Sequence, residues 1–193
     1  MFLANKYGLR TVTREEFKVL YESNNLGDLI FEVKQRFLPE FLSLYQTFKG
    51  DNEKPFEGVK EALRKLKDNK YILAVVTGRI IEPALVRREL KQHGLATLFN
   101  DILTNFPVDN PYDDSGILQK VTAIEKLLNK YNLPPDQCVV VGDYVADISS
   151  GKKLGCWTIA VLSGGMDYRI LERTQPDAIL KSVSEIPSLL KIA

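Results

Sequence analysis

Two carboxylates follow an apolar run in the second half of the chain. The segment "CVVVGDYVADISSGKKLGC", residues 138–156, passes from apolar residues to Gly142, and Asp143 and Asp147 stand four residues apart where we expect a helix to begin. Two negative charges at that spacing are neighbours on a helix and repel each other unless a cation or the helix N-terminus compensates them. Magnesium suits the pair, because it binds one or two carboxylates together with water and a substrate phosphate. The structural alternative is that both acids complement the helix dipole.

A threonine, a glycine and an arginine follow another apolar run. In "VVTGR", Thr77, Gly78 and Arg79 come directly after residues that predict a strand. A hydroxyl, a flexible backbone and the amides of a helix N-terminus can together bind an oxyanion such as phosphate. The structural alternative is an ordinary turn with an N-cap, and Arg79 either contacts a substrate or lies on the surface.

Lys120 is the third candidate. It lies near the start of a predicted helix, after the glycine of "DDSGILQK". From there an ammonium group can reach over the edge of a sheet and neutralise the charge of a phosphate or a carboxylate. The alternative is a solvated lysine, since the same helix carries several others.

These residues need a sheet to bring them together, and the sequence predicts one from residue 53 onward. Amphipathic helices alternate there with short, continuously apolar segments, which is the pattern of a parallel sheet covered on both faces. The predicted strands are 71–76, 101–104, 138–141, 157–162 and 177–180, and the predicted helices lie around 59–66, 81–93, 116–131 and 145–154, with a short helix at the end. In such sheets ligands bind beyond the carboxyl ends of the strands, where Thr77 and Asp143 stand.

The first part of the chain has a different pattern, which predicts helices only. The segment "TVTREEFKVLYES" has Thr13 as N-cap and Glu16 three residues later, which predicts a capping box. A second helical pattern follows and is interrupted by a proline. The polar, turn-rich segment 49–55 then separates this part from the alternating pattern, so we expect two domains, residues 1–52 and 53–193.

Composition narrows the possible function classes. The chain has 193 residues, 45% of them apolar and 26% charged, an ordinary globular balance. A formal net charge of +1 gives no reason to expect nucleic acid or an anionic membrane surface as a partner. The first residues contain no long apolar stretch, so we expect neither a signal peptide nor a membrane anchor, and a cytoplasmic location. Cys138 and Cys156 lie in or beside apolar runs and predict reduced core thiols.

In order along the chain, "VVTGR", the helix-leading lysine and "VVVGDYVADISSGKKLG" resemble motifs two, three and four of the haloacid dehalogenase superfamily of phosphotransferases. The separation of Lys120 from Asp143 resembles that of phosphoserine-phosphatase-like members, and the approach to Thr77 resembles the phosphoglycolate phosphatase type. The all-helical first part resembles the cap that this superfamily inserts after its first strand. The resemblance implies a three-layer α/β/α, Rossmann-like parallel-sheet core, residues 53–193, with a small helical cap domain, residues 1–52.

The same resemblance implies magnesium-dependent hydrolysis of a small phosphomonoester through an aspartyl-phosphate. Thr77 and the Gly78 amide would bind the phosphoryl oxygens. Lys120 would neutralise the developing charge, and Asp143 would hold magnesium with help from Asp147, directly or through water. The expected partner is a small phosphorylated metabolite, with no nucleic acid and no membrane.

One part of the family pattern is absent. The first motif is an apolar strand ending in Asp-x-Asp, whose first Asp attacks phosphorus and whose second acts as general acid and base. Asp28 lies in a helical stretch, and the acids within 109–114 lie in a polar loop, so no segment supplies this motif. We therefore expect the first, central strand of the sheet to be absent, so that 71–76 and 138–141 pair directly or another segment fills the gap.

Three explanations for the missing motif stay open. The chain is a shortened version of an ordinary phosphatase, a non-catalytic relative that keeps an anion and metal pocket for binding or regulation, or a protein whose first motif comes from another polypeptide. In each case we expect these 193 residues alone to be nearly inactive. The alternative to an enzyme is a module that binds a phosphorylated small molecule without turnover.

Overall fold

The computed structural model describes residue 6, residues 10–23, residue 40, residues 54–105 and residues 117–192. The chain divides into two compact units, Met1–Asn52 and Glu53–Ala193. The candidate site residues all belong to the second unit, which holds every described strand.

The described helix of the first unit is α2, Arg14–Glu22. Its capping box is the predicted one, because Thr13 Oγ1 accepts a hydrogen bond from the Glu16 amide at 3.1 Å and the Glu16 carboxylate accepts one from the Thr13 amide at 3.0 Å. The two bonds satisfy amides that the start of a helix otherwise leaves without partners. The second helical pattern predicted for this unit lies outside the described residues.

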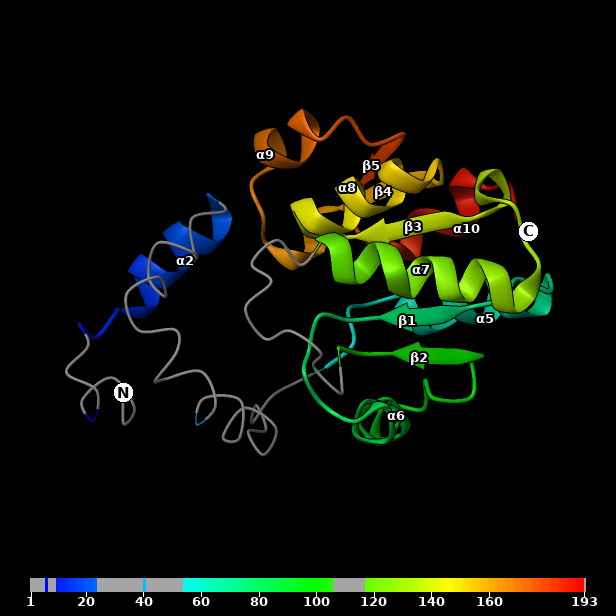
Figure 1. Cartoon of the computed structure of the whole chain (residues 1–193), viewed down its shortest axis with the longest axis horizontal. Helices are drawn as coiled ribbons and strands as arrows, with labels where there is room; N and C mark the ends of the chain where they lie inside the picture. The colour runs from blue at the N-terminus through cyan, green and yellow to red at the C-terminus, as the bar shows by residue number, and fades with distance from the viewer. Residues whose placement is uncertain (1–5, 7–9, 24–39, 41–53, 106–116, 193) are drawn as a thin grey trace. The chain divides into compact units, whose positions relative to one another are not determined.

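The second unit alternates helices and strands, and the prediction of an α/β fold is confirmed (Figure 1). Its α-helices are α5 (Val59–Asp68), α6 (Pro83–Gln92), α7 (Ile117–Tyr131), α8 (Val145–Leu154), α9 (Tyr168–Arg173) and α10 (Ile186–Leu189). Its strands are β1 (Ala74–Val76), β2 (Asp101–Leu103), β3 (Val139–Gly142), β4 (Trp157–Val161) and β5 (Ala178–Leu180). Its 3-10 turns are η1 (Pro135–Gln137), η2 (Leu162–Gly164) and η3 (Val183–Glu185). The short helix α9 was not predicted, and β1 begins three residues later than the predicted strand 71–76.

The strands form two parallel sheets rather than one. β1 pairs with β2, and β3, β4 and β5 pair in that order. β1 and β3 do not pair with each other, and none of the strands in the described part of the chain lies between them. Of the two alternatives expected for a missing central strand, direct pairing of these segments is therefore wrong, and the other, a segment that fills the gap, stays a prediction. The facing edges of β1 and β3 border a pocket, and residues of α5, α7 and α10 also line it.

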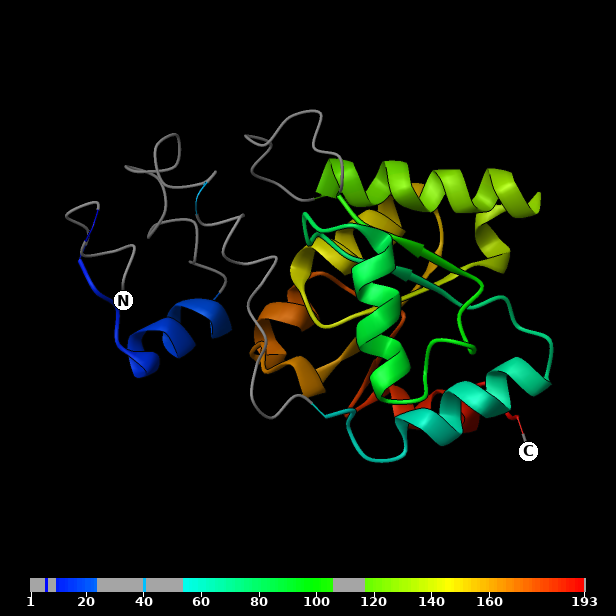
Figure 2. The same cartoon turned by 90° about the horizontal axis from the view of Figure 1, so that it is seen from below.

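Helices cover both faces of the strands (Figure 2). Helix α7 lies on one face, and α5 and α10 lie on the other. Leu66 of α5 packs with Ile159 of β4 and Ile186 of α10 in one core cluster. Leu73, which precedes β1, contacts this cluster and also a second one around Leu63. Helix α5 and the residue that leads into β1 therefore join the two sheets through apolar packing.

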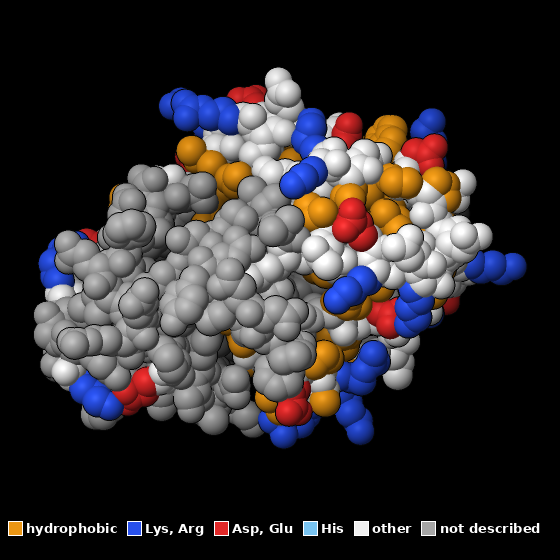
Figure 3. All heavy atoms as spheres, viewed as in Figure 1, with side chains coloured by type: hydrophobic (Ala, Val, Ile, Leu, Met, Phe, Trp, Pro, Cys, Tyr) orange, Lys and Arg blue, Asp and Glu red, His pale blue; other side chains and the backbone are white. Residues whose placement is uncertain are grey.

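The surface carries both signs of charge. On the face seen in Figure 3, Lys and Arg side chains lie among Asp and Glu side chains, so that no single sign dominates the described part of that face. No helix among the described residues has the length and apolar character needed to cross a membrane.

One carboxylate fixes the start of β5 to β4. Asp177 Oδ2 accepts hydrogen bonds from the amide and the hydroxyl of Thr158, each at 2.7 Å, and Thr158 is fully buried. Hydrogen bonds from the Thr158 hydroxyl and then from its amide lower the pKa of the Asp177 carboxyl, because they favour its ionised form.

We predict that Asp177→Ala lowers the free energy of unfolding at pH 7 by about 1–2 kcal/mol, because Thr158 loses a charged acceptor at a partly solvated position. Since the folded pKa lies below the ordinary value near 3.8, this contribution is complete above that pH and is lost as the pH falls through the folded pKa. Urea unfolding from pH 7 down to pH 3 measures the difference. Asp136→Ala, on an exposed turn, is the matched control, and equal losses in the two variants would contradict the prediction.

Candidate functional site

Thr77 and Gly78 occupy the carboxyl end of β1. The Thr77 amide donates to the Leu103 carbonyl of β2 at 3.0 Å, so the pairing with β2 extends one residue beyond the strand. Thr77 Oγ1 accepts a hydrogen bond from the Arg79 amide at 3.3 Å, which is the turn-capping role that the sequence left open. That bond uses the hydroxyl as an acceptor, and a hydroxyl can still donate its proton to an anion.

Asn105 links this turn to α7. Its Nδ2 donates to the Gly78 carbonyl at 3.2 Å and also to Oε1 of Gln119, on α7. Sequence analysis missed Asn105, although a polar residue soon after the strand "DIL" belongs to the same sheet edge as the other candidates. Its two contacts place the turn after β1 beside the start of α7.

Lys120 follows Gln119 on α7 and forms an ion pair with Asp147 of α8. The exposed fractions of the two side chains are only 16% and 15%, so the pair is shielded from solvent on most sides. The second Asp147 oxygen accepts a hydrogen bond from the Tyr144 amide at 3.1 Å, which caps the start of α8. Lys120 is therefore not a solvated lysine, and Asp147 is both a helix-capping residue and the partner of a cation.

Close packing against glycines holds both carboxylates in place. A Cβ added at Gly164, in η2 after β4, would lie 1.8 Å from Asp143 Oδ2. A Cβ added at Gly142 would lie 2.1 Å from the Asp147 Cβ. Atoms cannot approach that closely, so the absence of a side chain at Gly142 and Gly164 makes room for the two acids.

The Arg79 side chain forms an ion pair with Glu89 of α6. Its guanidinium contacts the Glu89 carboxylate of α6 through two bonds of 2.6 and 3.0 Å. A bidentate pair of this kind fixes the orientation of the arginine. The pair connects the turn after β1 to α6, which favours a positioning role for Arg79 over substrate contact.

The residues that could hold a metal ion are Asp143 and Asp147. Among the described residues, no group of three or more His, Cys, Asp or Glu side chains could hold one. Magnesium needs only one or two carboxylates when water and a substrate phosphate complete its shell. The donor set fits magnesium with Asp143 as a direct ligand, whereas Asp147, which already contacts Lys120 and the Tyr144 amide, fits better through water.

The cysteines and the tyrosine nearest to the site are held in their neutral forms. Cys138 and Cys156 are free thiols. Burial raises the pKa of Cys138 and, with the neighbouring thiol, raises the pKa of Cys156 to about 12, so neither is a thiolate nucleophile near pH 7. Burial, and then the charge of Asp147, also raise the pKa of the Tyr144 phenol.

The fold and the position of these residues define an α/β protein whose candidate site lies at the carboxyl ends of parallel strands. The chain belongs to the haloacid dehalogenase-like hydrolase family, whose model matches residues 2–161. The family resemblance seen in the sequence motifs is thus confirmed.

Known relatives agree with this assignment. The chain is 32% identical over 140 residues to pyrophosphatase PpaX of Halalkalibacterium halodurans, covering 72% of this chain and 59% of the relative. It is 27% identical over 137 residues to a phosphoglycolate phosphatase of Vibrio vulnificus, covering 70% of this chain and 56% of the relative. The match therefore spans less than two thirds of either relative. A crystal structure of a predicted phosphatase from Clostridium acetobutylicum shares the fold, with a TM-score of 0.76, 18% identity, and coverage of 98% of this chain and 87% of that one.

We predict that Gly164→Ala destabilises the second unit by displacing the Asp143 side chain. The effect is best isolated by a double-mutant cycle with Asp143→Gly, which removes every atom that the new Cβ would meet on Asp143. We expect a coupling energy of about 1–3 kcal/mol, measured by urea unfolding. Ser163→Ala in the same turn serves as the control. Additive effects of Gly164→Ala and Asp143→Gly would show that the close contact does not exist in solution.

Proposed function

We propose that the second unit binds the phosphate group of a small phosphomonoester together with magnesium, as the binding half of a phosphatase site. The observation that carries the proposal is a connected series of side-chain contacts. Asn105 bonds to Gly78 and Gln119, and the next residue on α7, Lys120, pairs with Asp147. These contacts support a common site for the residues of the three family-like motifs, which come from distant parts of the chain.

Each residue has a role that follows from its chemistry. The Thr77 hydroxyl and the Gly78 amide donate to phosphoryl oxygens, since both follow β1 and precede a helix. The Lys120 ammonium neutralises phosphate charge from a position where little water screens it. Asp143 holds magnesium, with Asp147 assisting through water, and the bound ion stabilises negative charge on the phosphate.

Turnover through an aspartyl-phosphate requires an attacking carboxylate that residues 1–193 do not supply in the expected Asp-x-Asp pattern. Asp147 pairs with Lys120, and Asp143 is assigned to magnesium, so neither takes the role of the attacking carboxylate. The proposed activity of this chain is therefore phosphate binding with very little hydrolysis. Hydrolysis of a small phosphomonoester is proposed for a form in which the nucleophile is present.

The second candidate is a non-catalytic module that binds a phosphorylated ligand as its natural task. It needs only the contacts already described, those of Lys120 with Asp147 and of Asn105 with Gly78 and Gln119, and no attacking carboxylate. Supplying the missing strand separates the two candidates, because a phosphatase regains Asp143-dependent turnover and a binding module does not.

We predict that the purified 193-residue protein binds inorganic phosphate in a magnesium-dependent manner but hydrolyses p-nitrophenyl phosphate at a rate near background. Lys120→Met should weaken phosphate binding about tenfold or more, because the variant loses a charge-assisted hydrogen bond. Titration calorimetry with and without magnesium measures the affinity. Lys126→Met, exposed on the same helix, is the matched control and should bind normally.

Two results would contradict this account. Rapid hydrolysis that depends on Asp143 would show that the chain already holds a working nucleophile. Equal phosphate affinity in the Lys120→Met and Lys126→Met variants would show that Lys120 does not contact the anion.

A further inference from the structure

Asn105 lies opposite the turn that follows β1. Val76 of β1 pairs with Leu103 of β2, and the same register continued by two residues places Gly78 opposite Asn105. The Asn105 side chain donates from Nδ2 to the Gly78 carbonyl at 3.2 Å, and the Asn105 backbone amide donates to the Arg79 carbonyl at 3.1 Å. One residue that follows β2 therefore binds two successive carbonyls of the turn after β1.

The orientation of the Asn105 amide group follows from its partners. A backbone carbonyl only accepts hydrogen bonds, so the nitrogen and not the oxygen of this side chain must face Gly78. The other proton on the same nitrogen is donated to Oε1 of Gln119, on α7. A single nitrogen atom therefore joins the turn after β1 to helix α7.

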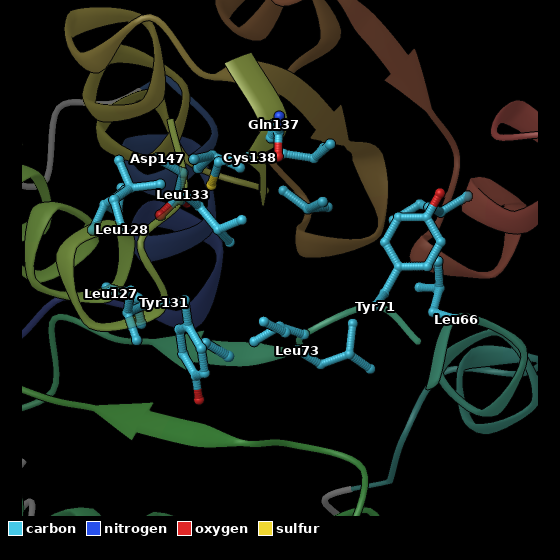
Figure 4. Close-up of a pocket in the computed structure, with 18 of the residues that line it drawn as sticks. Leu66, Tyr71, Leu73, Leu127, Leu128, Tyr131, Leu133, Gln137, Cys138 and Asp147 are labelled. Atoms are coloured by element: carbon cyan, nitrogen blue, oxygen red, sulfur yellow. The ribbon is translucent and has the colours of Figure 1, made fainter. Parts of the chain in front are cut away.

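Helix α7 holds Gln119 in place. Ile124 and Leu128 of the same helix pack with Cys156 in one core cluster. Figure 4 shows Leu127 and Leu128 beside the pocket between the two sheets. Apolar packing further along the helix thus fixes the position of Gln119, which in turn limits the orientations open to its hydrogen-bond partner.

The bond to Gly78 continues to the Thr77 hydroxyl. The Gly78 carbonyl and the Arg79 amide belong to one planar peptide group, and that amide donates to Thr77 Oγ1 at 3.3 Å. Threonine hydroxyls often accept such a bond in a local turn. Here the peptide group that donates the bond is also held on its carbonyl side by Asn105, which comes from the end of a different strand.

The two bonds run in the same direction. Asn105 donates into the Gly78 carbonyl, which polarises the peptide group and makes its amide a better donor to the hydroxyl. Since Thr77 Oγ1 accepts from that amide, the proton of the hydroxyl points away from it and can be donated to an anion. The series of bonds therefore sets the direction of the Thr77 proton and strengthens Thr77 as a donor.

We propose that Asn105 is a positioning residue for phosphate binding, which orients the Thr77 hydroxyl through the peptide group that follows Gly78. The inference rests on the proposed phosphate site and adds the residue that sets the direction of one of its donors. Asn105 acts without touching the phosphate, since its side-chain protons are donated to Gly78 and Gln119.

The first test removes the Asn105 donors. Asn105→Leu keeps the approximate size of the side chain, excludes water from its place and introduces no charge. We expect the affinity for inorganic phosphate, measured by titration calorimetry with magnesium present, to fall about fivefold or more. Asn69→Leu is the matched control, because Asn69 also donates from Nδ2 to a backbone carbonyl, that of Lys65 at the end of α5. This control should bind phosphate as the unchanged protein does.

A double-mutant cycle identifies the route of the effect. Thr77→Val removes the hydroxyl and keeps the shape, and should weaken phosphate binding about tenfold or more. If Asn105 acts through that hydroxyl, adding Asn105→Leu to Thr77→Val should weaken binding no further, to within about twofold. A general disturbance of the turn would instead weaken binding equally with and without the hydroxyl.

A second measurement needs no phosphate. The Arg79 amide should exchange its hydrogen with solvent about fivefold faster in Asn105→Leu than in the unchanged protein, because the peptide group is no longer held on its carbonyl side. Exchange at Arg79 should be unchanged in Asn69→Leu. Circular dichroism establishes that all variants are folded.

Several outcomes overturn the proposal, and they are distinguishable from failure of the phosphate site. If the unchanged protein binds phosphate and Asn105→Leu binds equally well, or if the losses of Asn105→Leu and Thr77→Val add, Asn105 does not act through the hydroxyl. Unaltered exchange at Arg79 in Asn105→Leu leads to the same conclusion. If the unchanged protein binds no phosphate, the proposed function fails, and the role of Asn105 in binding fails with it.

Discussion

Among the residues that the structure describes, the two sheets of the second unit are held together by side-chain packing and not by backbone hydrogen bonds between their strands. β1 and β3 face each other across a pocket, and apolar contacts of α5, α7 and α10 set their separation. Leu73 belongs to two core clusters at once and thus couples the approach to β1 with β4 and α10. The relative position of the two strand ends therefore depends on how three helices pack, a less specific constraint than a ladder of paired strands.

The candidate site depends on that separation. Thr77 and Gly78 belong to one sheet, whereas Asp143 belongs to the other. Helix α7 connects the two groups, because Gln119 contacts Asn105 and the adjacent Lys120 contacts Asp147. The relative position of the turn after β1 and the start of α8 therefore depends on α7, which contacts both.

Most of the fold could be predicted, because it follows from local patterns. Continuous apolar segments and amphipathic helices gave the order of the elements, and Thr13 and Glu16 gave a cap that the structure contains. Contacts between distant segments could not be predicted in this way. Gly164 follows β4 and Asp143 follows β3, so their close approach brings together two segments that are distant in the sequence. Asn105 likewise contacts Gly78 after β1 and Gln119 on α7, and no single segment of the sequence contains these partners. Strand β1 is shorter than its apolar run, because its partner β2 begins only at Asp101, opposite Ala74.

Amide hydrogen exchange resolved by NMR tests directly whether the facing edges of β1 and β3 have no strand paired to them. In the 193-residue protein, the amides of Val76 and Val141 should exchange much faster than those of Val75 and Val140, because the hydrogen-bond alternation of parallel strands directs Val75 toward β2 and Val140 toward β4. Alternating fast and slow exchange along both strands is the predicted result. Uniformly slow exchange in β1 and β3 would mean that another segment already pairs with these edges, and would contradict the account.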